Sequence, residues 1–500
     1  MNKVFLFLGF ALLGFCACKQ SSNNADTTKF LDPSTMDSAV KAGDNFWLYA
    51  NGSWNKTSVI PETENGIGAF NDLRKKSREA LKKICEEAAG AKANAGTVEQ
   101  KVGDFYASSM DSAAIDKLGY QPLKPFLDEI NALTDAKGVL AYVAKHHSMG
   151  DALMFNFAVQ PDDKNAAINT CSFTQGGLGL PEKDYYFSSD TKIVEQRKAY
   201  AKYIAQLFQL TGDDANTATQ NAETVMSIET QMANGQFSNI ELRDPNKNYH
   251  KLGKADIAKL APNIDWNAVF SDLKMNLDSF IVGQPAFYTT LSSLVGYLTV
   301  PEWKQYLRFH EINNTAQFLS KPFVDARFEF YDKILGGQQK QKDRWERMAM
   351  LTDQFLGEAL GQLYVKKHFD DKAKQRMMDL VNNLQQVYSK RIKDLDWMSD
   401  STKAKAQAKL NTFIKKIGFP DKWKEYKVDI KRDDFFGNVL KLAQLTFEQQ
   451  IVKQGKPVDK TEWGMTPPTI NAYYNPYYNE IVFPAGILQF PFFDMNADDA

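Results

Sequence analysis

The sequence predicts a mainly α-helical protein with its β-strands close to the C-terminus. Apolar residues recur at intervals of three and four through most of the 500-residue chain, the spacing that builds one buried face of a helix. Near the end, two short β-rich runs at 470–474 and 480–483 are separated by the breaking pair Asn475-Pro476. We therefore expect a hairpin or near-hairpin there, at the edge of a sheet.

The length and charge of the chain limit the class of protein. Five hundred residues allow about two to four domains with a large core. Lys and Arg number 60 and Asp and Glu number 61, which gives a net charge of −1. A balanced charge provides no attraction for nucleic acid or for an anionic membrane surface. We therefore expect no nucleic-acid partner.

The first residues have the pattern of a bacterial export signal. Lys3 precedes an apolar run at 4–15 that is too short to span a bilayer. The run leads into a lipobox-like sequence in which Cys18 is the lipidated residue, although Phe15 stands where leucine is usual. We expect a lipoprotein signal peptide at 1–18, a flexible tether at 19–42, and attachment to a periplasmic or surface-facing membrane leaflet. An ordinary signal peptide is the alternative.

Amphipathic patterns predict helices in the remainder of the chain, at 72–89, 98–110, 122–133, 194–210, 222–235, 374–395 and 401–417. The clearest is 374–395, where apolar residues including Met377, Val381 and Leu384 form one stripe. Ser399 or Asp400 can cap the next helix, which Gly418 is expected to end. The aromatic segment 43–73 and the glycine-rich segment 175–187 read as loops.

The cysteines and histidines do not form a recognisable catalytic set. Cys85 and Cys171 are too few for a disulfide framework, and their spacing does not decide whether they pair. A zinc peptidase helix needs two histidines at i and i+4. His310 has Asn314 at the second position, and an amide is a poor zinc ligand. We expect surface or hydrogen-bonded core roles for the five histidines: His146, His147, His250, His310 and His368.

Several phrases resemble the neprilysin family of zinc metallopeptidases, which includes endothelin-converting enzyme and bacterial oligopeptidase O. They are DNFWLYANGSW at 44–54, QGGLGLPEKDYY at 175–186, RDPNKNY at 243–249, WMSDSTKAKA at 397–406, and NAYY followed by IVFPAGILQFPFF within 471–493. Their order makes the set more specific than any single phrase. The resemblance implies a large multi-helix N-terminal lobe at 43–430. A connection and the beginning of a thermolysin-like α+β zinc peptidase domain would follow at 431–500.

The resemblance also implies a substrate-binding site. The Asn471 side chain and the Ala472 carbonyl would hold the substrate backbone beyond the scissile bond, as a peptide bound along a sheet edge requires. Phe70, Ile487 and Phe492 would line the pocket for the residue after that bond. Because all three are apolar, the resemblance implies a preference for a bulky apolar residue. Ordinary core packing is the alternative role for these three side chains.

The function implied is that of a zinc metalloendopeptidase with peptide substrates and a membrane anchor. Gly66 stands where some relatives carry an arginine that binds a substrate's free carboxylate, so we expect cleavage within longer peptides rather than dipeptide release. One zinc per full-length protein would polarise the scissile carbonyl while a glutamate activates water. We expect those groups on an H-E-x-x-H helix within about twenty to thirty residues beyond Ala500.

The 500-residue chain alone is therefore expected to bind no catalytic zinc and to cleave no peptide. Two alternatives from other functional classes stay open. One is a lipoprotein that binds peptides or glycans without cleaving them, and the other is a truncated pseudoenzyme.

Overall fold

The computed structural model describes residues 32–150, 152–495 and 497, and their mainly α-helical architecture confirms the predicted fold class. The chain divides into two compact units, Met1–Ser58 and Val59–Ala500. The expected lipidation site, Cys18, lies outside the described residues. No helix in the described ranges has the length and apolar character that crossing a membrane requires.

The first unit contains a helix where the sequence indicated a loop. Its helix α1 (Phe46–Thr57) begins where the Asn45 side chain accepts a hydrogen bond from the Leu48 N–H at 2.9 Å. Gly52, which suggested a break, lies inside the helix. A Cβ at Gly52 would lie 2.5 Å from the Cβ of Asp37, so this glycine permits close packing rather than a turn.

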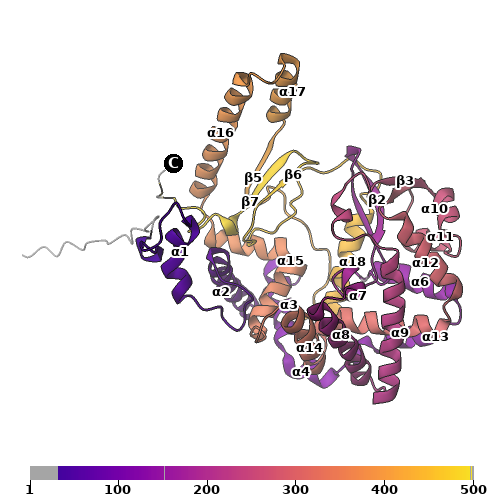
Figure 1. Ribbon diagram of the computed structural model, residues 1–500. Coiled ribbons are helices and arrows are strands. Elements are labelled where there is room, and N and C mark those ends of the chain that lie inside the picture. Colours follow the sequence, from indigo (N-terminus) through magenta and orange to yellow (C-terminus); the bar gives the residue numbers. More distant parts are fainter. Residues whose placement is uncertain (1–31, 151, 496, 498–500) are drawn as a thin grey trace, which may run out of the picture. The chain divides into compact units, whose positions relative to one another are not determined.

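The second unit consists mainly of helices (Figure 1). In chain order its α-helices are α2 (Ala69–Gly90), α3 (Val98–Met110), α4 (Ser112–Leu118), α5 (Lys124–Asn131), α6 (Ala136–His147), α7 (Asp184–Phe187), α8 (Thr191–Leu210), α9 (Ala215–Asn234), α10 (Lys254–Leu260), α11 (Trp266–Asp272), α12 (Pro285–Tyr297), α13 (Val300–Thr315), α14 (Lys321–Arg327), α15 (Arg344–His368), α16 (Asp371–Asp394), α17 (Asp400–Asn411) and α18 (Phe435–Ile451). A π-helical segment, η5 (Phe328–Leu335), follows α14 directly. The helices expected at 72–89, 98–110, 194–210, 222–235 and 374–395 are all present, with ends shifted by a few residues at most positions.

A four-stranded sheet lies within the helical region, where we expected no strands. Its order is β1-β2-β4-β3, built from β1 (Phe155–Asp162), β2 (Asn165–Gln175), β3 (His250–Gly253) and β4 (Ser279–Val282). The strand β2 pairs on both sides and has a central run of five buried residues that includes Thr170 and Ser172. Because small polar residues occupy this buried strand, it lacks the alternation of apolar and polar residues that identifies a half-buried strand.

A second sheet, of order β5-β7-β6, contains the predicted C-terminal hairpin. Its antiparallel pair β6 (Tyr473–Asn475) and β7 (Glu480–Pro484) confirms the hairpin, and β5 (Ile414–Gly418) pairs with β7 in parallel. The helix expected at 401–417 was too long, because α17 ends at Asn411 and the chain then enters β5. Gly418 therefore ends a strand, at φ +83°, where a Cβ would lie 2.4 Å from the Phe369 ring.

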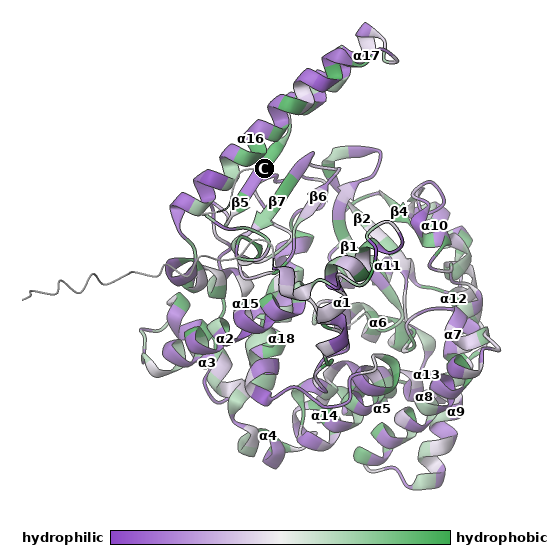
Figure 2. Cartoon of the chain, turned by 60° about the vertical axis from the view of Figure 1, so that its left-hand side comes forward, coloured by the Kyte–Doolittle hydropathy of each residue, from purple (hydrophilic) through white to green (hydrophobic). Residues whose placement is uncertain are grey.

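The second sheet is packed by a small hydrophobic core separate from the main one. Its buried members are Leu73, Met377, Val381, Ile417, Ile470, Ile487 and Leu488. The apolar stripe of α16 enters this core only through its first half. Farther along α16, Leu384 is 52% exposed and Tyr388 is 61% exposed. Figure 2 shows hydrophobic and hydrophilic residues interspersed along this helix, which forms a hairpin with α17.

Candidate functional site

The sheet order places β6 at an edge, with Asn471 and Ala472 immediately before it. One side of β6 pairs with β7 in the register Tyr473↔Val482, and no strand pairs with its other side among the described residues. Asn471 is exposed, and its side-chain oxygen accepts the N–H of Ala472 at 2.9 Å. An open strand edge of this kind can accept an extended peptide through backbone hydrogen bonds.

Two of the predicted pocket residues meet although they are far apart in sequence. Phe70 lies in the first turn of α2, and its ring centroid is 4.3 Å from that of Phe492, with the planes tilted by 46°. Both rings are about two-fifths exposed, so they offer an apolar surface to a ligand. The guanidinium of Arg74, one helical turn beyond Phe70, lies 5.6 Å from the centre of the Phe70 ring. Arg74 was not among the predicted site residues.

The third predicted pocket residue, Ile487, is only 7% exposed and belongs to the second core together with Leu73 and Ile470. Its side chain therefore packs into the second core and offers little surface to a ligand. The backbone at this point is closely packed, because a Cβ on Gly486 would lie 2.4 Å from the Pro468 carbonyl oxygen. Only glycine is compatible with that approach.

Hydrogen bonds attach the segment that follows to the helical region. The Gln489 side-chain amide donates to the Tyr364 hydroxyl of α15 at 2.9 Å and to the Gly486 carbonyl at 3.1 Å. The N–H of Phe492 then donates to the Gln489 carbonyl at 2.9 Å. The position of the Phe492 ring is therefore tied to α15 through Gln489.

The sequence did not predict a buried ion pair between two strands of this sheet. Lys416 of β5 and Glu480 of β7 approach to 2.7 Å between Nζ and Oε2, with the Lys416 side chain 8% exposed and that of Glu480 fully buried. The Lys416 ammonium also donates to the Glu462 carbonyl at 2.5 Å. Burial raises the pKa of Tyr473, whose hydroxyl faces Glu480, to about 12. This ion pair links β5 to β7, the strand that pairs with β6.

The described residues do not form a zinc site. His310 is buried, and its Nε2 lies 2.9 Å from Glu229, while the Nδ1 of His146 lies 2.7 Å from Glu311. Each pair supplies one imidazole only, and the Tyr200 hydroxyl also donates to Glu229 at 2.9 Å. No cluster of three or more His, Cys, Asp or Glu residues that could hold a metal occurs among the described residues. These residues therefore do not fit the zinc that the resemblance implies.

The cysteines take no part in a nucleophilic site. Cys85 and Cys171 are both free and buried, which answers the question that their spacing left open. Burial raises the pKa of the Cys171 thiol to about 12 and that of the Cys85 thiol well above its usual range. Because the thiolate is the nucleophile, neither residue is poised for catalysis.

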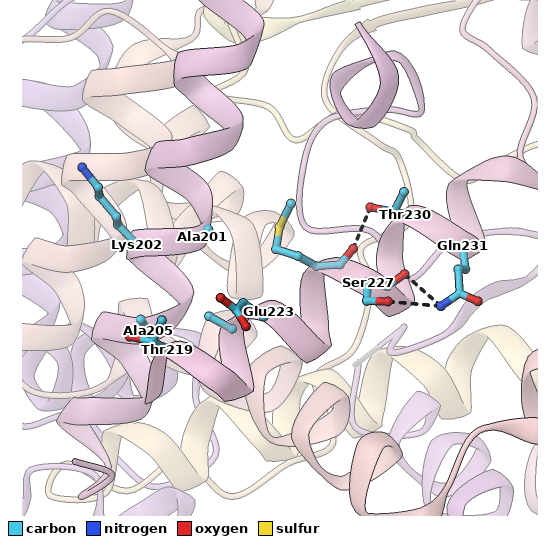
Figure 3. Close-up of a pocket in the computed structure, with 10 residues that line it drawn as sticks. Ala201, Lys202, Ala205, Thr219, Glu223, Ser227, Thr230 and Gln231 are labelled. Carbon is cyan, nitrogen blue, oxygen red and sulfur yellow. Dashed lines mark hydrogen bonds between the residues drawn. The ribbon is translucent and has the colours of Figure 1, made fainter. Parts of the chain in front are cut away.

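A surface hollow of about 630 Å³ lies between α8 and α9, away from the predicted site residues (Figure 3). Its walls include Ala201, Ala205 and Met226. Two of its polar side chains bond mainly within α9: the Thr230 hydroxyl donates to the Met226 carbonyl, and the Gln231 amide donates to Ser227, while the Gln231 oxygen accepts the Tyr297 hydroxyl. None of the predicted site residues lines this hollow.

Comparisons with known proteins agree with the phrases in the sequence. Residues 42–420 match one sequence model described as peptidase family M13, and residues 471–500 match a second with the same description. The endothelin-converting enzyme homolog of Locusta migratoria is 29% identical, and the match covers 92% of this chain and 67% of that protein. Endothelin-converting enzyme 1 of Rattus norvegicus is 27% identical over 93% of this chain.

The match to the rat protein covers 63% of its length, so the chain spans about two thirds of these two relatives. A solved structure agrees with the fold. The zinc metalloprotease Zmp1 of Mycobacterium tuberculosis, in complex with an inhibitor, is 35% identical with a TM-score of 0.88. This match covers 94% of our chain and 72% of that one. Taken with the family match over more than half of its length, this shows that the chain belongs to peptidase family M13.

Proposed function

We propose that this chain is the larger, N-terminal part of a zinc metalloendopeptidase and carries the half of the active site that holds the peptide. The observation that supports this most directly is the open edge of β6, which directly follows Asn471 and Ala472. The small sheet that contains β6 packs on the hydrophobic core to which Ile487 belongs. Family membership and the name of Zmp1 support the reaction class. The zinc and its ligands would lie in a continuation beyond Ala500.

In this proposal an extended peptide adds to the free side of β6. The Ala472 carbonyl accepts a backbone N–H of the substrate, and the Asn471 side-chain amide bonds the substrate backbone from the other side. These contacts recognise the backbone, so they tolerate many sequences. The exposed faces of Phe70 and Phe492 then take up the side chain after the scissile bond, which favours a bulky apolar residue there.

Arg74 adds a charge preference to this pocket. Gly66 supplies no cation, and the exposed Arg74 guanidinium lies beside the Phe70 ring. It can meet an acidic side chain or a nearby terminal carboxylate of the peptide. Because Arg74 is exposed to solvent, this attraction is weak and screened by salt. Longer peptides with an acidic residue near the apolar one are the substrates that this arrangement favours.

The test compares this chain with the product of its natural reading frame. We expect the product to continue past residue 500 into an H-E-x-x-H helix, to bind one zinc and to cleave peptides before bulky apolar residues. We expect residues 19–500 alone to bind no stoichiometric zinc and to cleave nothing. Metal analysis and peptidase assays on both proteins decide the matter. A stop codon directly after Ala500 would support a pseudoenzyme or a peptide- or glycan-binding lipoprotein instead.

Membrane attachment through Cys18 is a second proposal, supported by the lipobox-like sequence around that residue. Several acyl chains, at about 0.8 kcal/mol for each buried CH₂, anchor a protein stably. Changing Cys18→Ser should therefore move the protein from the membrane fraction to the soluble fraction. Retention of the variant in the membrane fraction would refute lipidation at this residue.

A further inference from the structure

A cavity of about 400 Å³ lies between α14, η5 and α15, remote in sequence from the predicted peptide site. One part of its lining is apolar and includes Val324, Phe328 and Leu351. The other part is polar and includes Arg327, Asp332, Gln341, Lys342 and Arg347. Segments of π-helix such as η5 are rare and often occur at functional sites.

The guanidinium of Arg347 has unused donors in this cavity. Its Nε donates to the Lys342 carbonyl at 3.1 Å, but within the described residues its two terminal nitrogens have neither a hydrogen-bond partner nor a carboxylate within 4 Å. Burial and the nearby charge of Arg344 lower the pKa of Arg347, while the carboxylates of Asp325 and Asp332 oppose this shift. The Arg347 side chain is half-buried, and a planar fork of two N–H groups matches a carboxylate.

The charges around the cavity favour a single negative charge on the ligand. Lys342 pairs with Glu64 at 2.8 Å, and Arg78, which shares Glu64, also pairs with Glu346, so these four charges balance. Arg327 lies 3.9 Å from Asp332, so these two charges also offset each other. Arg347 therefore supplies the remaining positive charge. A phosphate dianion would exceed that charge and would meet the Asp332 carboxylate, whereas a monoanion with an apolar body fits both parts of the lining.

We propose that this cavity binds a small organic carboxylate with an apolar tail, whose carboxylate pairs with the terminal nitrogens of Arg347. The tail lies against Val324, Phe328 and Leu351. The volume falls within the usual range for small-molecule sites, about 300–1,000 Å³. The site is independent of peptide cleavage, so it can be tested whether or not the chain proves to be an enzyme.

Isothermal titration of the 500-residue chain with sodium hexanoate tests the site, at constant ionic strength. We expect saturable binding of one hexanoate per chain, at least tenfold tighter than binding of the neutral analogue hexanamide or of inorganic phosphate. Arg347→Met should weaken binding at least tenfold. Gln341→Glu, which adds a negative charge to the lining with little change in shape, should do the same and serves as the second variant if Arg347→Met fails to fold.

Arg197→Met is the matched control, because Arg197 also donates only to carbonyl groups, those of Tyr185 and Ser188, and lines a different part of the molecule. It should bind hexanoate as the unmodified chain does. Weak, unsaturable heats that are the same in Arg347→Met and Arg197→Met would mean an adventitious ion only and would overturn the proposal. Tighter binding of phosphate than of hexanoate would also overturn it.

Discussion

Breaking the buried ion pair between Lys416 and Glu480 should loosen the strand edge that the proposed site uses. The pair is 2.7 Å long and almost fully buried, so each charge depends on the other. Glu480→Gln leaves the Lys416 ammonium buried with the Glu462 carbonyl as its remaining strong partner. Removing one member of such a pair costs about 3–5 kcal/mol, because the other charge stays unpaired and out of water. Lys416→Met should cost a similar amount.

The double variant Lys416→Met/Glu480→Leu separates this effect from simple loss of packing. With both charges replaced by apolar side chains, no unpaired charge is buried, and we expect most of the stability to return. The exposed pair Lys198–Glu195, in which both side chains are 65% exposed, is the matched control. Lys198→Met should change local stability by less than about 1 kcal/mol.

Hydrogen exchange at the amides of β5, β6 and β7 is the appropriate measurement, because a chain of this size does not unfold as one cooperative unit. A loss of 3–5 kcal/mol should accelerate exchange there by roughly a hundredfold to several thousandfold, since about 1.4 kcal/mol corresponds to tenfold. The amides of β1 and β2, in the other sheet, should be unaffected. Single variants that change exchange by less than tenfold, or a double variant as damaged as the two singles combined, would refute the reasoning.

Three further outcomes are expected. In the longer enzyme that we propose, Phe70→Ala and Ile487→Ala should reduce discrimination among apolar residues after the scissile bond by about 1–3 kcal/mol, and unchanged kcat/KM ratios across a peptide series would leave both with packing roles. Burial lowers the pKa of His147 to about 4. Since the unfolded chain binds that proton near pH 6.5, stability should fall by up to about 3 kcal/mol as the pH drops from 6.5 to 4. Hydrogen exchange at the amides of α6 should show a flatter pH dependence of local stability for His147→Phe, and an unchanged one would contradict this assignment. Met377→Ala should destabilise the second core by about 2–4 kcal/mol, whereas Leu384→Ala, on the exposed part of α16, should cost less than about 1 kcal/mol by local hydrogen exchange.

The sequence was informative where local pattern and tertiary environment agree. The helix predicted at 98–110 has the same ends in the structure, and the hairpin before Pro484 was identified from its two β-rich runs and the break at Asn475-Pro476. The central strand that contains Thr170 and Ser172 was not predicted. Its small polar residues are buried because the strand pairs within the sheet, and they leave no recognisable pattern in the sequence. Local sequence carries no information about such long-range pairing.

The same contrast between local and long-range information holds for the candidate site. Exposed Phe70 and Phe492 were assigned through the resemblance, and the structure brings their rings into contact. Lys416 and Glu480 were missed because charged residues are almost always exposed, and nothing beside either residue reveals its distant partner. Arg74 was overlooked for a related reason: its place beside the Phe70 ring depends on the start of α2, which lies three residues before the predicted one.

The strand edge cannot be understood from the C-terminal segment alone. Within 431–500, β6 and β7 form only a two-stranded hairpin, which is marginally stable by itself in water. Its third strand, β5, and the ion-pair partner Lys416 come from earlier in the chain. Leu73 of α2 and Met377 of α16 cover the core below, and Tyr364 of α15 holds the Gln489 side chain. The helices that precede the proposed peptide-binding edge therefore determine its position, so substitutions at Leu73 or Met377 should alter the proposed peptide binding although both residues are buried.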